Sequence, residues 1–275
     1  MKLFACMCNQ PLRLSAALAP VRAALAAGPP VSRWGLGYIQ GGDVLLIRTP
    51  KASTTPVDLA GPLLEIATDC AIAQAVSDPV GDTRYGGTDN TPPFRYRRWL
   101  FAQTAATTSI ELDEVGPTLL EHVPEYLRRN LKGRTPAELF FHIFLAKLAD
   151  IGVLDDPNLP TQVTRRALAT TLKLVSTELD KAGKDLAMGT VAVSNGRSML
   201  VARPAHSPHP LRLRKLWLSD ERGKQEQGHE AFRGVLLVSG NAGEGDLRDG
   251  FEDVPANHAV MISRDLHVTL ADLAP

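Results

Sequence analysis

The sequence has few cysteines, no long apolar run and no excess charge of either sign. Three cysteines in 275 residues are too few for a disulfide framework, which favours a reducing compartment. No apolar run reaches the roughly 18 residues that a membrane-spanning helix needs. Thirty basic residues balance thirty acidic residues, which argues against a dedicated nucleic-acid surface or a polybasic membrane surface. We therefore expect no nucleic-acid partner and no membrane association.

The start of the chain does not have the pattern of a signal peptide. Lys2 precedes an apolar stretch over residues 3–8, but this stretch is too short and polar Asn9, Gln10 and Arg13 follow it. We therefore expect a cytoplasmic protein. Apolar residues make up 44% of the chain and charged residues 22%, which is typical of a folded globular protein rather than a disordered one. Without a low-complexity linker, residues 1–275 are predicted to form a single domain.

Two β-rich regions flank a helical middle. In the first region, strands are predicted at residues 3–8, 36–39, 44–48, 70–76 and 99–105, with a helix over 14–27 that Pro20 kinks or delays and a short helix over 62–68. The middle is predicted to hold helices over 117–129, 136–151 and 161–182. In the last region, strands are predicted at 187–194, 198–203, 213–219, 234–239, 259–263 and 267–270. The order predicts mixed α+β layers.

Turn and cap residues support these boundaries. The run Gln40-Gly41-Gly42-Asp43 and the pair Asn195-Gly196 are typical of β-hairpin turns. Thr135-Pro136-Ala137-Glu138 is a capping-box pattern, with proline at the first helical position. Gly183 is placed to end the last long helix. Residues 77–93 and 241–253 are rich in proline, glycine or acidic side chains and are predicted to be loops.

Several segments, in order along the chain, have counterparts in one family. Residues 3–11, which read Leu-Phe-Ala-Cys-Met-Cys-Asn-Gln-Pro, resemble the first strand of class II glutamine amidotransferases, in the branch of small bacterial proteins with an N-terminal nucleophile. Ser32-Arg33-Trp34-Gly35-Leu36-Gly37-Tyr38 is similar to the family's Asp-Gly-Trp-Gly-x-Gly-Tyr. Ile72-Ala73-Gln74-Ala75-Val76 stands where the family has Ile-Ala-His-Val-Arg. Asn90-Thr91-Pro92-Pro93-Phe94 and Trp99-Leu100-Phe101-Ala102-Gln103-Thr104-Ala105 resemble Asn-Thr-His-Pro-Phe and Trp-x-Phe-Ala-His-Asn-Gly.

The resemblance implies a fold, and it also implies that the catalytic nucleophile is missing. The implied fold is a four-layer α/β/β/α sandwich of two antiparallel sheets, as in N-terminal nucleophile hydrolases. The family hydrolyses the glutamine side-chain amide with a cysteine thiolate whose own α-amine is the base. In the resemblance, that cysteine falls on Met1, and the second residue is Lys2. Neither residue carries a thiol, so the sequence predicts no catalytic residue.

The positions that would support catalysis differ as well. The family's oxyanion donors become Thr104 and Ala105, and the arginine that grips the glutamine α-carboxylate becomes Val76. The resemblance therefore implies an altered pocket, whose candidate residues are Ser32, Arg33, Trp34, Gln74, Val76, Pro92, Gln103 and Thr104. Within it, Trp34 is expected to be structural.

The cysteines, the histidine pair and one glycine-rich segment are the remaining candidates for a chemical role. Removal of residues 1–5 would make Cys6 an N-terminal nucleophile, although Cys6, Cys8 and Cys70 fit small buried hydrophobic residues better. A metal at Cys6-x-Cys8 lacks a second ligand pair at zinc-finger spacing, and His206-x-x-His209 fits an exposed loop pair. Acidic residues crowd Gly243-Glu244-Gly245, which disfavours a phosphate cradle. The sequence thus predicts no metal and no cofactor.

Charge is unevenly distributed in the last third of the chain. Residues 195–217 contain basic residues and no acid, whereas residues 220–253 are predominantly acidic. A second basic cluster lies near Trp99, and its simpler interpretation is a solvated strand edge. The candidates for a partner surface are Arg95, Arg97, Arg98, Arg212, Arg214 and Lys215. We expect a catalytically inactive amidotransferase-like subunit that binds a protein partner or a small ligand, with a homo-oligomer among its expected assemblies. The alternatives are an enzyme, either a processed amidohydrolase that uses Cys6 or a glutaminase-like subunit with divergent chemistry, and a structural subunit of a larger assembly.

Overall fold

Two antiparallel sheets form the centre of the molecule in the computed structural model, which describes residues 1–79, 84–104, 112–184, 188–218, 231–240 and 250–273. The seven-stranded sheet has the order β13-β11-β12-β1-β6-β3-β4, and the six-stranded sheet has the order β15-β14-β10-β9-β8-β7. The first sheet contains β1 (Lys2–Cys8), β3 (Arg33–Gln40), β4 (Asp43–Thr49), β6 (Cys70–Val76), β11 (Leu211–Trp217), β12 (Arg233–Gly240) and β13 (Glu252–Val254). The second contains β7 (Phe94–Tyr96), β8 (Trp99–Gln103), β9 (Val191–Ser194), β10 (Met199–Arg203), β14 (His258–Ile262) and β15 (Val268–Asp272).

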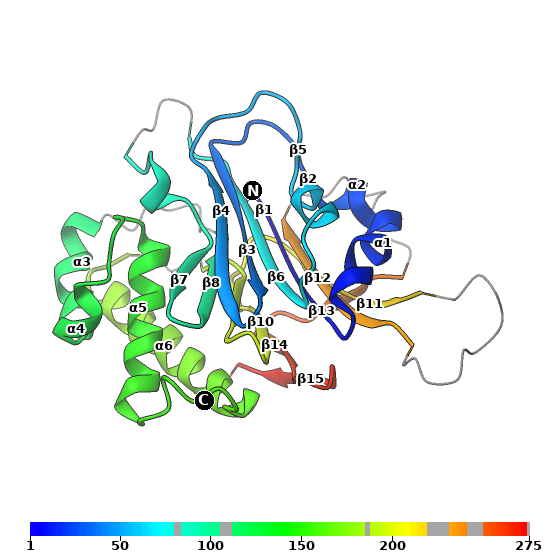
Figure 1. Cartoon of the computed structure of the whole chain (residues 1–275). Helices are drawn as coiled ribbons and strands as arrows, with labels where there is room; N and C mark the ends of the chain where they lie inside the picture. The colour runs from blue at the N-terminus through cyan, green and yellow to red at the C-terminus, as the bar shows by residue number, and fades with distance from the viewer. Residues whose placement is uncertain (80–83, 105–111, 185–187, 219–230, 241–249, 274–275) are drawn as a thin grey trace.

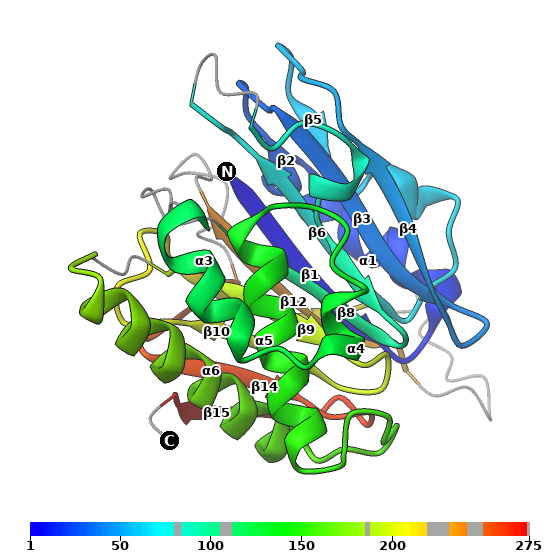
Figure 2. The ribbon, with the colours of Figure 1, turned by 90° about the vertical axis from the view of Figure 1, so that its left-hand side faces the viewer.

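Helices cover the outer face of each sheet, which gives the four-layer α/β/β/α sandwich that the resemblance implies (Figures 1 and 2). The short helices α1 (Leu14–Leu18) and α2 (Arg22–Leu25) pack on the seven-stranded sheet. The long helices α5 (Pro136–Asp150) and α6 (Thr161–Lys181) cover the six-stranded sheet, together with α3 (Leu112–Glu121) and α4 (Glu125–Arg128). The predicted α+β class and sandwich architecture are therefore confirmed.

Strand β1 lies near the middle of its sheet and is buried along its whole length. Its side chains alternate between two apolar layers because successive side chains of a strand point to opposite faces. Leu3, Ala5 and Met7 enter the layer between the two sheets, whereas Cys6 and Cys8 enter the layer beneath α1 and α2. This double burial explains why the sequence segment is an unbroken apolar run.

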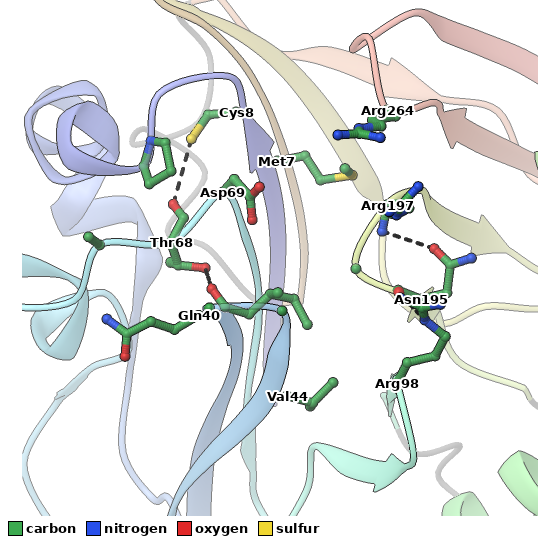
Figure 3. Close-up of a pocket in the computed structure, with 16 residues that line it drawn as sticks. Met7, Cys8, Gln40, Val44, Thr68, Asp69, Arg98, Asn195, Arg197 and Arg264 are labelled. Atoms are coloured by element: carbon green, nitrogen blue, oxygen red, sulfur yellow. Dashed lines mark hydrogen bonds between the residues drawn. The ribbon is translucent and has the colours of Figure 1, made fainter. Parts of the chain in front are cut away.

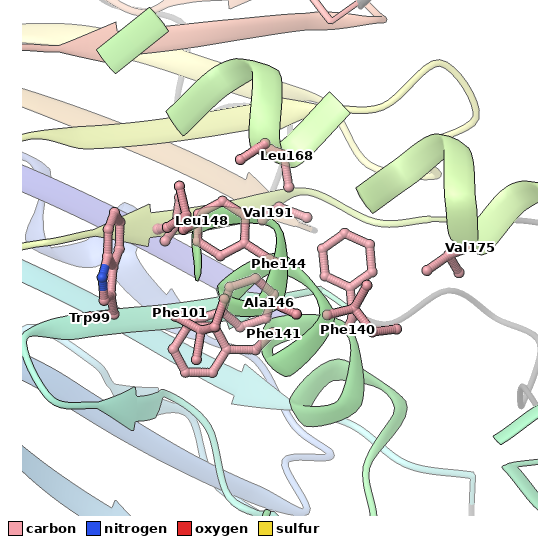
Figure 4. Close-up of a cluster of buried hydrophobic side chains, with 14 of the residues drawn as sticks. Trp99, Phe101, Phe140, Phe141, Phe144, Ala146, Leu148, Leu168, Val175 and Val191 are labelled. Carbon is pink, nitrogen blue, oxygen red and sulfur yellow. The ribbon is translucent and has the colours of Figure 1, made fainter. Parts of the chain in front are cut away.

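The helical side of the sandwich is held by a third apolar cluster, in which α5 presents aromatic side chains to β8 (Figure 4). The ring of Phe101 stacks on that of Phe141 with centroids 4.9 Å apart, and Trp99 meets Phe144 edge to face at 5.6 Å. Thr135 caps α5 as predicted, since its Oγ1 accepts a hydrogen bond of 3.2 Å from the Glu138 N–H. The Glu138 carboxylate accepts from the N–H groups of Lys132 and Gly133 instead of returning to the cap residue.

Some predicted elements differ from the observed ones. The predicted helix over 14–27 breaks at Pro20, which lies in a 3-10 turn between α1 and α2, and its last residues form the short strand β2 (Ala26–Ala27) against β5 (Val57–Asp58). Only a 3-10 turn over Gly61–Leu64 stands where a helix over 62–68 was predicted. Strand β13 was missed because its acidic residues read as loop. Parts of the predicted loops and the first residue of the predicted strand over 187–194 lie outside the described residues.

Within the ranges that the structure describes, no helix is long and apolar enough to cross a membrane.

Candidate functional site

The start of β1 lies between β6 and β12, where these strands of the seven-stranded sheet end. Lys2 pairs with Ala75 of β6 and with Gly240 of β12. Gly240 adopts φ +116°, and a Cβ there would collide with the backbone carbonyl of Met1. Burial lowers the pKa of the Met1 α-amine, and the Lys2 ammonium lowers it further. The α-amine at the start of β1 thus lies against closely packed backbone, and no thiol is present there.

His209 belongs to the same region, although the sequence placed it in an exposed loop. Burial lowers the pKa of its imidazole, and the positive charge of the N-terminus lowers it again. Burial and the nearby positive charge both favour the neutral ring. Leu211 of β11 pairs with Ser239, one residue before Gly240. The β11–β12 pairing therefore places the loop that contains His209 beside the start of β1.

A line of polar side chains connects the two sheets beside this end of β1. The Gln74 side-chain Nε2 donates a hydrogen bond of 2.6 Å to the backbone carbonyl of Gln103, which lies in the opposite sheet. The Thr104 N–H donates to the Thr190 carbonyl at 2.9 Å. The Thr190 hydroxyl shares a hydrogen bond of 2.8 Å with the hydroxyl of Ser239 on β12. Polar groups therefore interrupt the otherwise apolar layer between the sheets.

Two buried polar atoms in this region have no hydrogen-bond partner within the part of the chain that the structure describes. They are Oε1 of Gln74 and Oγ1 of Thr104, whose residues are 2% and 0% exposed. An unsatisfied buried polar atom costs roughly 1–3 kcal/mol. Both atoms are therefore suited to hydrogen-bond a polar group that enters between the sheets. Gly189 keeps the backbone close at this point, because a Cβ there would collide with the Thr104 carbonyl.

The pocket candidates Ser32 and Arg33 are engaged in a polar network of their own. The Arg33 guanidinium forms an ion pair with Asp78, and its Nε donates to the Asn90 carbonyl at 3.0 Å. The Ser32 Oγ accepts from the Asp78 N–H at 2.9 Å. The side chains of the ion pair are only 7% and 14% exposed. The two residues thus hold the loop after β6 against the start of β3.

Arg33 also changes the interpretation of Val76. The sequence predicted that replacement of the family's arginine by Val76 leaves no cation at that position. In the β3–β6 ladder, Arg33 lies directly opposite Val76, so a guanidinium is present one strand away. Its charge is neutralised by Asp78, and the site therefore gains no unpaired cation from Arg33.

Trp34 is separated from the other pocket candidates by the sheet itself. It packs against the apolar layer beneath α1 and α2, whereas Gln74 faces the opposite sheet. The cause is strand alternation, which sends neighbours Arg33 and Trp34 to opposite faces. Its expected structural role fits this placement, but its assignment to the pocket with Gln74 does not. Pro92 is buried near β3, where a Cβ on Gly35 would approach its carbonyl too closely.

The three cysteines are buried, as expected of small hydrophobic residues: Cys6 and Cys70 are 0% exposed and Cys8 is 5% exposed. Burial raises the pKa of all three thiols, to about 12 for Cys8 and for Cys70. The Cys8 thiol donates to the Thr68 carbonyl at 3.7 Å, and Cys70 shares a hydrogen bond of 3.2 Å with Ser194. Thiols in this state are poor nucleophiles and poor metal ligands. In the described ranges, no group of three or more histidine, cysteine or acidic residues is placed to hold a metal.

The basic candidates for a partner surface do not form one surface. Arg95, Arg97 and Arg98 belong to the β7–β8 hairpin of the six-stranded sheet, whereas Arg212, Arg214 and Lys215 lie on β11 of the other sheet. Several of them contact other parts of the chain. Arg97 pairs with Asp155, Arg212 pairs with Asp253, and Arg214 lies over the Phe251 ring.

The basic and acidic stretches of the last third meet at the surface of the seven-stranded sheet. Arg212 pairs with Asp253 because β11 and β13 are neighbours in the sheet. Part of the charge segregation is thus neutralised within the chain. Ala105 and the segment Gly243-Glu244-Gly245 lie outside the described residues.

Several residues of this region were not found from the sequence. Asp78, Thr190 and Ser239 lie far apart along the chain and match no motif. Only the order of strands in the two sheets brings Thr190 to Ser239, and no local pattern predicts that order. Asp78 in particular lies in a segment whose composition indicates a loop and nothing more.

The two sheets with their outer helices form the fold that class II glutamine amidotransferase-like proteins have. The chain is similar over its full length to a glutamine aminotransferase class-II domain protein from Silicibacter pomeroyi, also matched over its full length, with 16% identity and a TM-score of 0.58. A predicted glutamine amidotransferase from Pseudomonas aeruginosa is similar over 98% of this chain and 99% of its own, with 14% identity and a TM-score of 0.51.

A third similar structure is the glutamine phosphoribosylpyrophosphate amidotransferase from B. subtilis, with 11% identity and a TM-score of 0.55. That match spans all of this chain but only 49% of the larger enzyme. At such identities the likeness shows the fold and not the activity. No protein-family model matches the sequence, and no curated protein matches it.

Proposed function

We propose that this chain is an amidotransferase-like protein that does not hydrolyse glutamine and acts as a binding or regulatory subunit. One observation carries this proposal: Lys2 begins the central strand and Met1 directly precedes it. A thioether and a buried ammonium replace the thiol that forms the acyl intermediate in the family's reaction. Without that nucleophile, the remaining groups have no covalent step to support.

The altered pocket supports the same conclusion. Thr104 replaces an asparagine amide as oxyanion donor, and loss of one such donor typically costs about 10²–10³ in rate. Val76 cannot bind the α-carboxylate of free glutamine, and the nearby Arg33 is already paired with Asp78. Recognition of free glutamine therefore lacks both its charge partner and its reacting group.

The geometry of Cys6 argues against the processed amidohydrolase. Cys6 pairs with Ala71 and Leu236 in the middle of β1, and its side chain faces the layer beneath α1 and α2. The polar groups between the sheets lie on the other face of β1. Removal of residues 1–5 would also delete most of the central strand's pairing with β6 and β12.

A binding role is supported by the polar atoms that remain between the sheets. Gln74 Oε1 and Thr104 Oγ1 are buried and available to a ligand other than free glutamine. A protein partner is the second form of the same proposal, and affinity capture from the native host followed by mass spectrometry distinguishes the two forms. Recovery of one stoichiometric partner favours the partner form, and co-purification of a small molecule favours the ligand form.

Two measurements test the proposal. The intact mass of the native protein should correspond to a chain that retains residues 2–5, and a mature chain that begins at Cys6 would overturn the proposal. Calorimetric titration with glutamine should give no saturable heat, whereas tight glutamine binding would contradict the altered pocket.

A further inference from the structure

A cleft of about 300 Å³ opens between the two sheets at the end of β1 farthest from Met1. Met7 and Cys8 of β1 line it together with residues of the β3–β4 hairpin (Figure 3). Because β1 rises roughly 3.4 Å per residue, this cleft lies about 20 Å from the start of the strand. It is therefore separate from the polar region around Gln74 and Thr104.

Three arginines line one wall of the cleft. Arg98 comes from the turn between β7 and β8, Arg197 from the β9–β10 hairpin and Arg264 from the turn between β14 and β15. Figure 3 shows them on the side opposite Thr68 and Cys8. In the part of the chain that the structure describes, none of the three forms an ion pair with a carboxylate within 4 Å. Three neighbouring turns thus bring three guanidinium groups together, of which that of Arg197 also donates to the side-chain Oδ1 of Asn158 at 2.7 Å.

The turns that carry these arginines are held in place. Asn195 is 1% exposed, and its Oδ1 accepts from the N–H groups of Arg197 and Ser198 at 3.0 and 2.9 Å. Its backbone carbonyl accepts from Arg98 Nε at 3.3 Å, which joins two of the three turns. Gly196 adopts φ +83°, and a Cβ there would lie 3.3 Å from Ile39 of the other sheet. Hydrogen bonds and close packing therefore fix the backbone of the turns that carry Arg98 and Arg197.

The opposite wall carries a single acid. Asp69 is half-buried, and burial raises the pKa of its carboxyl while Arg264 lowers it. Among the described residues, the lining of the cleft therefore holds three guanidinium groups and one carboxylate, an excess of two positive charges. Guanidinium groups bind phosphate and carboxylate through paired N–H donors. A carboxylate across the cleft accepts a hydrogen bond from a hydroxyl group.

We propose that this cleft binds a small phosphate monoester whose organic part carries a hydroxyl group. The dianionic phosphate would lie against Arg98, Arg197 and Arg264, and the hydroxyl would donate to Asp69. The volume is at the lower end of ligand sites in proteins, which suits a molecule of this size. The site is independent of the proposed function at the other end of the sandwich.

Calorimetric titration with glycerol 3-phosphate tests the site, with inorganic phosphate, succinate and glycerol as comparison probes. We expect saturable one-to-one binding of glycerol 3-phosphate, weaker binding of inorganic phosphate, and none of glycerol. Arg98→Gln and Arg264→Gln should each weaken the affinity at least tenfold, since each removes a charge-assisted hydrogen bond. Arg97→Gln is the matched control: it removes an equal charge one residue away, from a side chain that pairs with Asp155 outside the cleft.

Three results would overturn the assignment. They are absence of saturable binding at millimolar glycerol 3-phosphate, tighter binding of succinate than of the phosphate monoester, and equal weakening by Arg97→Gln. Circular dichroism and urea unfolding of each variant establish that the variants are folded before titration.

Discussion

The guanidinium of Arg33 and the carboxylate of Asp78 form an ion pair between the first residue of β3 and the loop that follows β6. Because both side chains are largely buried, removal of one partner leaves an uncompensated charge. We expect Asp78→Asn to lower the free energy of unfolding by roughly 3 kcal/mol. Urea denaturation followed by fluorescence measures the change.

The exposed pair Arg97–Asp155 is the control for this prediction. Its side chains are 55% and 64% exposed, and pairs of this kind contribute less than about 1 kcal/mol. Asp155→Asn should therefore change the stability little. Equal effects of the two substitutions would show that the Arg33–Asp78 pair has no special structural role.

Gly189 is expected to tolerate no side chain. A Cβ at this position would collide with the backbone carbonyl and the hydroxyl of Thr104, which cannot move without breaking the Thr104–Thr190 hydrogen bond. We expect Gly189→Ala to destabilise the fold by about 2–3 kcal/mol or more, as overpacking does. Gly28→Ala is the control, since a Cβ there meets nothing within 4 Å. A stable Gly189→Ala variant would contradict the close approach.

The cap of α5 should contribute to stability through Thr135 Oγ1. Thr135→Ala removes the acceptor for the Glu138 N–H and should cost about 1 kcal/mol in thermal or urea unfolding. Thr135→Ser keeps the hydroxyl and should lose much less. A loss as large in the serine variant as in the alanine variant would assign the effect to the methyl group's packing.

Thiol burial predicts a loss of stability at alkaline pH. The pKa of Cys8 and that of Cys70 are raised to about 12 in the folded state, from an ordinary value near 9. Between these values the unfolded chain releases protons that the folded chain retains, so stability falls as pH rises, by roughly 1.4 kcal/mol per pH unit for each thiol. Urea unfolding at pH 8 and pH 10 measures this slope.

The Cys8→Ala, Cys70→Ala double variant isolates the contribution of these thiols from other alkaline titrations. Its stability should fall less steeply between pH 8 and pH 10 than that of the unmodified chain. Identical slopes would mean that the two thiols are not protected by burial.

Much of the fold could be predicted from local patterns. The apolar run of β1, the glycine turn of the β3–β4 hairpin and the capped start of α5 are each specified by neighbouring residues. The six strands predicted in the last third are all present; β9 begins at Val191 rather than at residue 187, and the ends of the others shift by one or two residues. Short elements with charged residues, such as β13, were missed because pairing with β11 rather than local sequence determines them.

The candidate site was less predictable, and for physical reasons. Strand alternation places Trp34 on the opposite face from Arg33, and a motif alone does not specify faces. The ion pair of Arg33 with Asp78 depends on a loop whose path has no sequence signal. Likewise, the ion pair of Arg212 with Asp253 follows from sheet order, which places an acidic partner beside an expected surface charge.

The central claim is the absence of glutamine hydrolysis, and the direct measurement is glutamate release from glutamine by the full chain, after its intact mass is recorded. We expect no release above the protein-free rate at millimolar glutamine, and no difference between the unmodified chain and Cys6→Ala. Glutamate release that rises in proportion to protein concentration, and that Cys6→Ala abolishes while the variant remains folded, would contradict the claim.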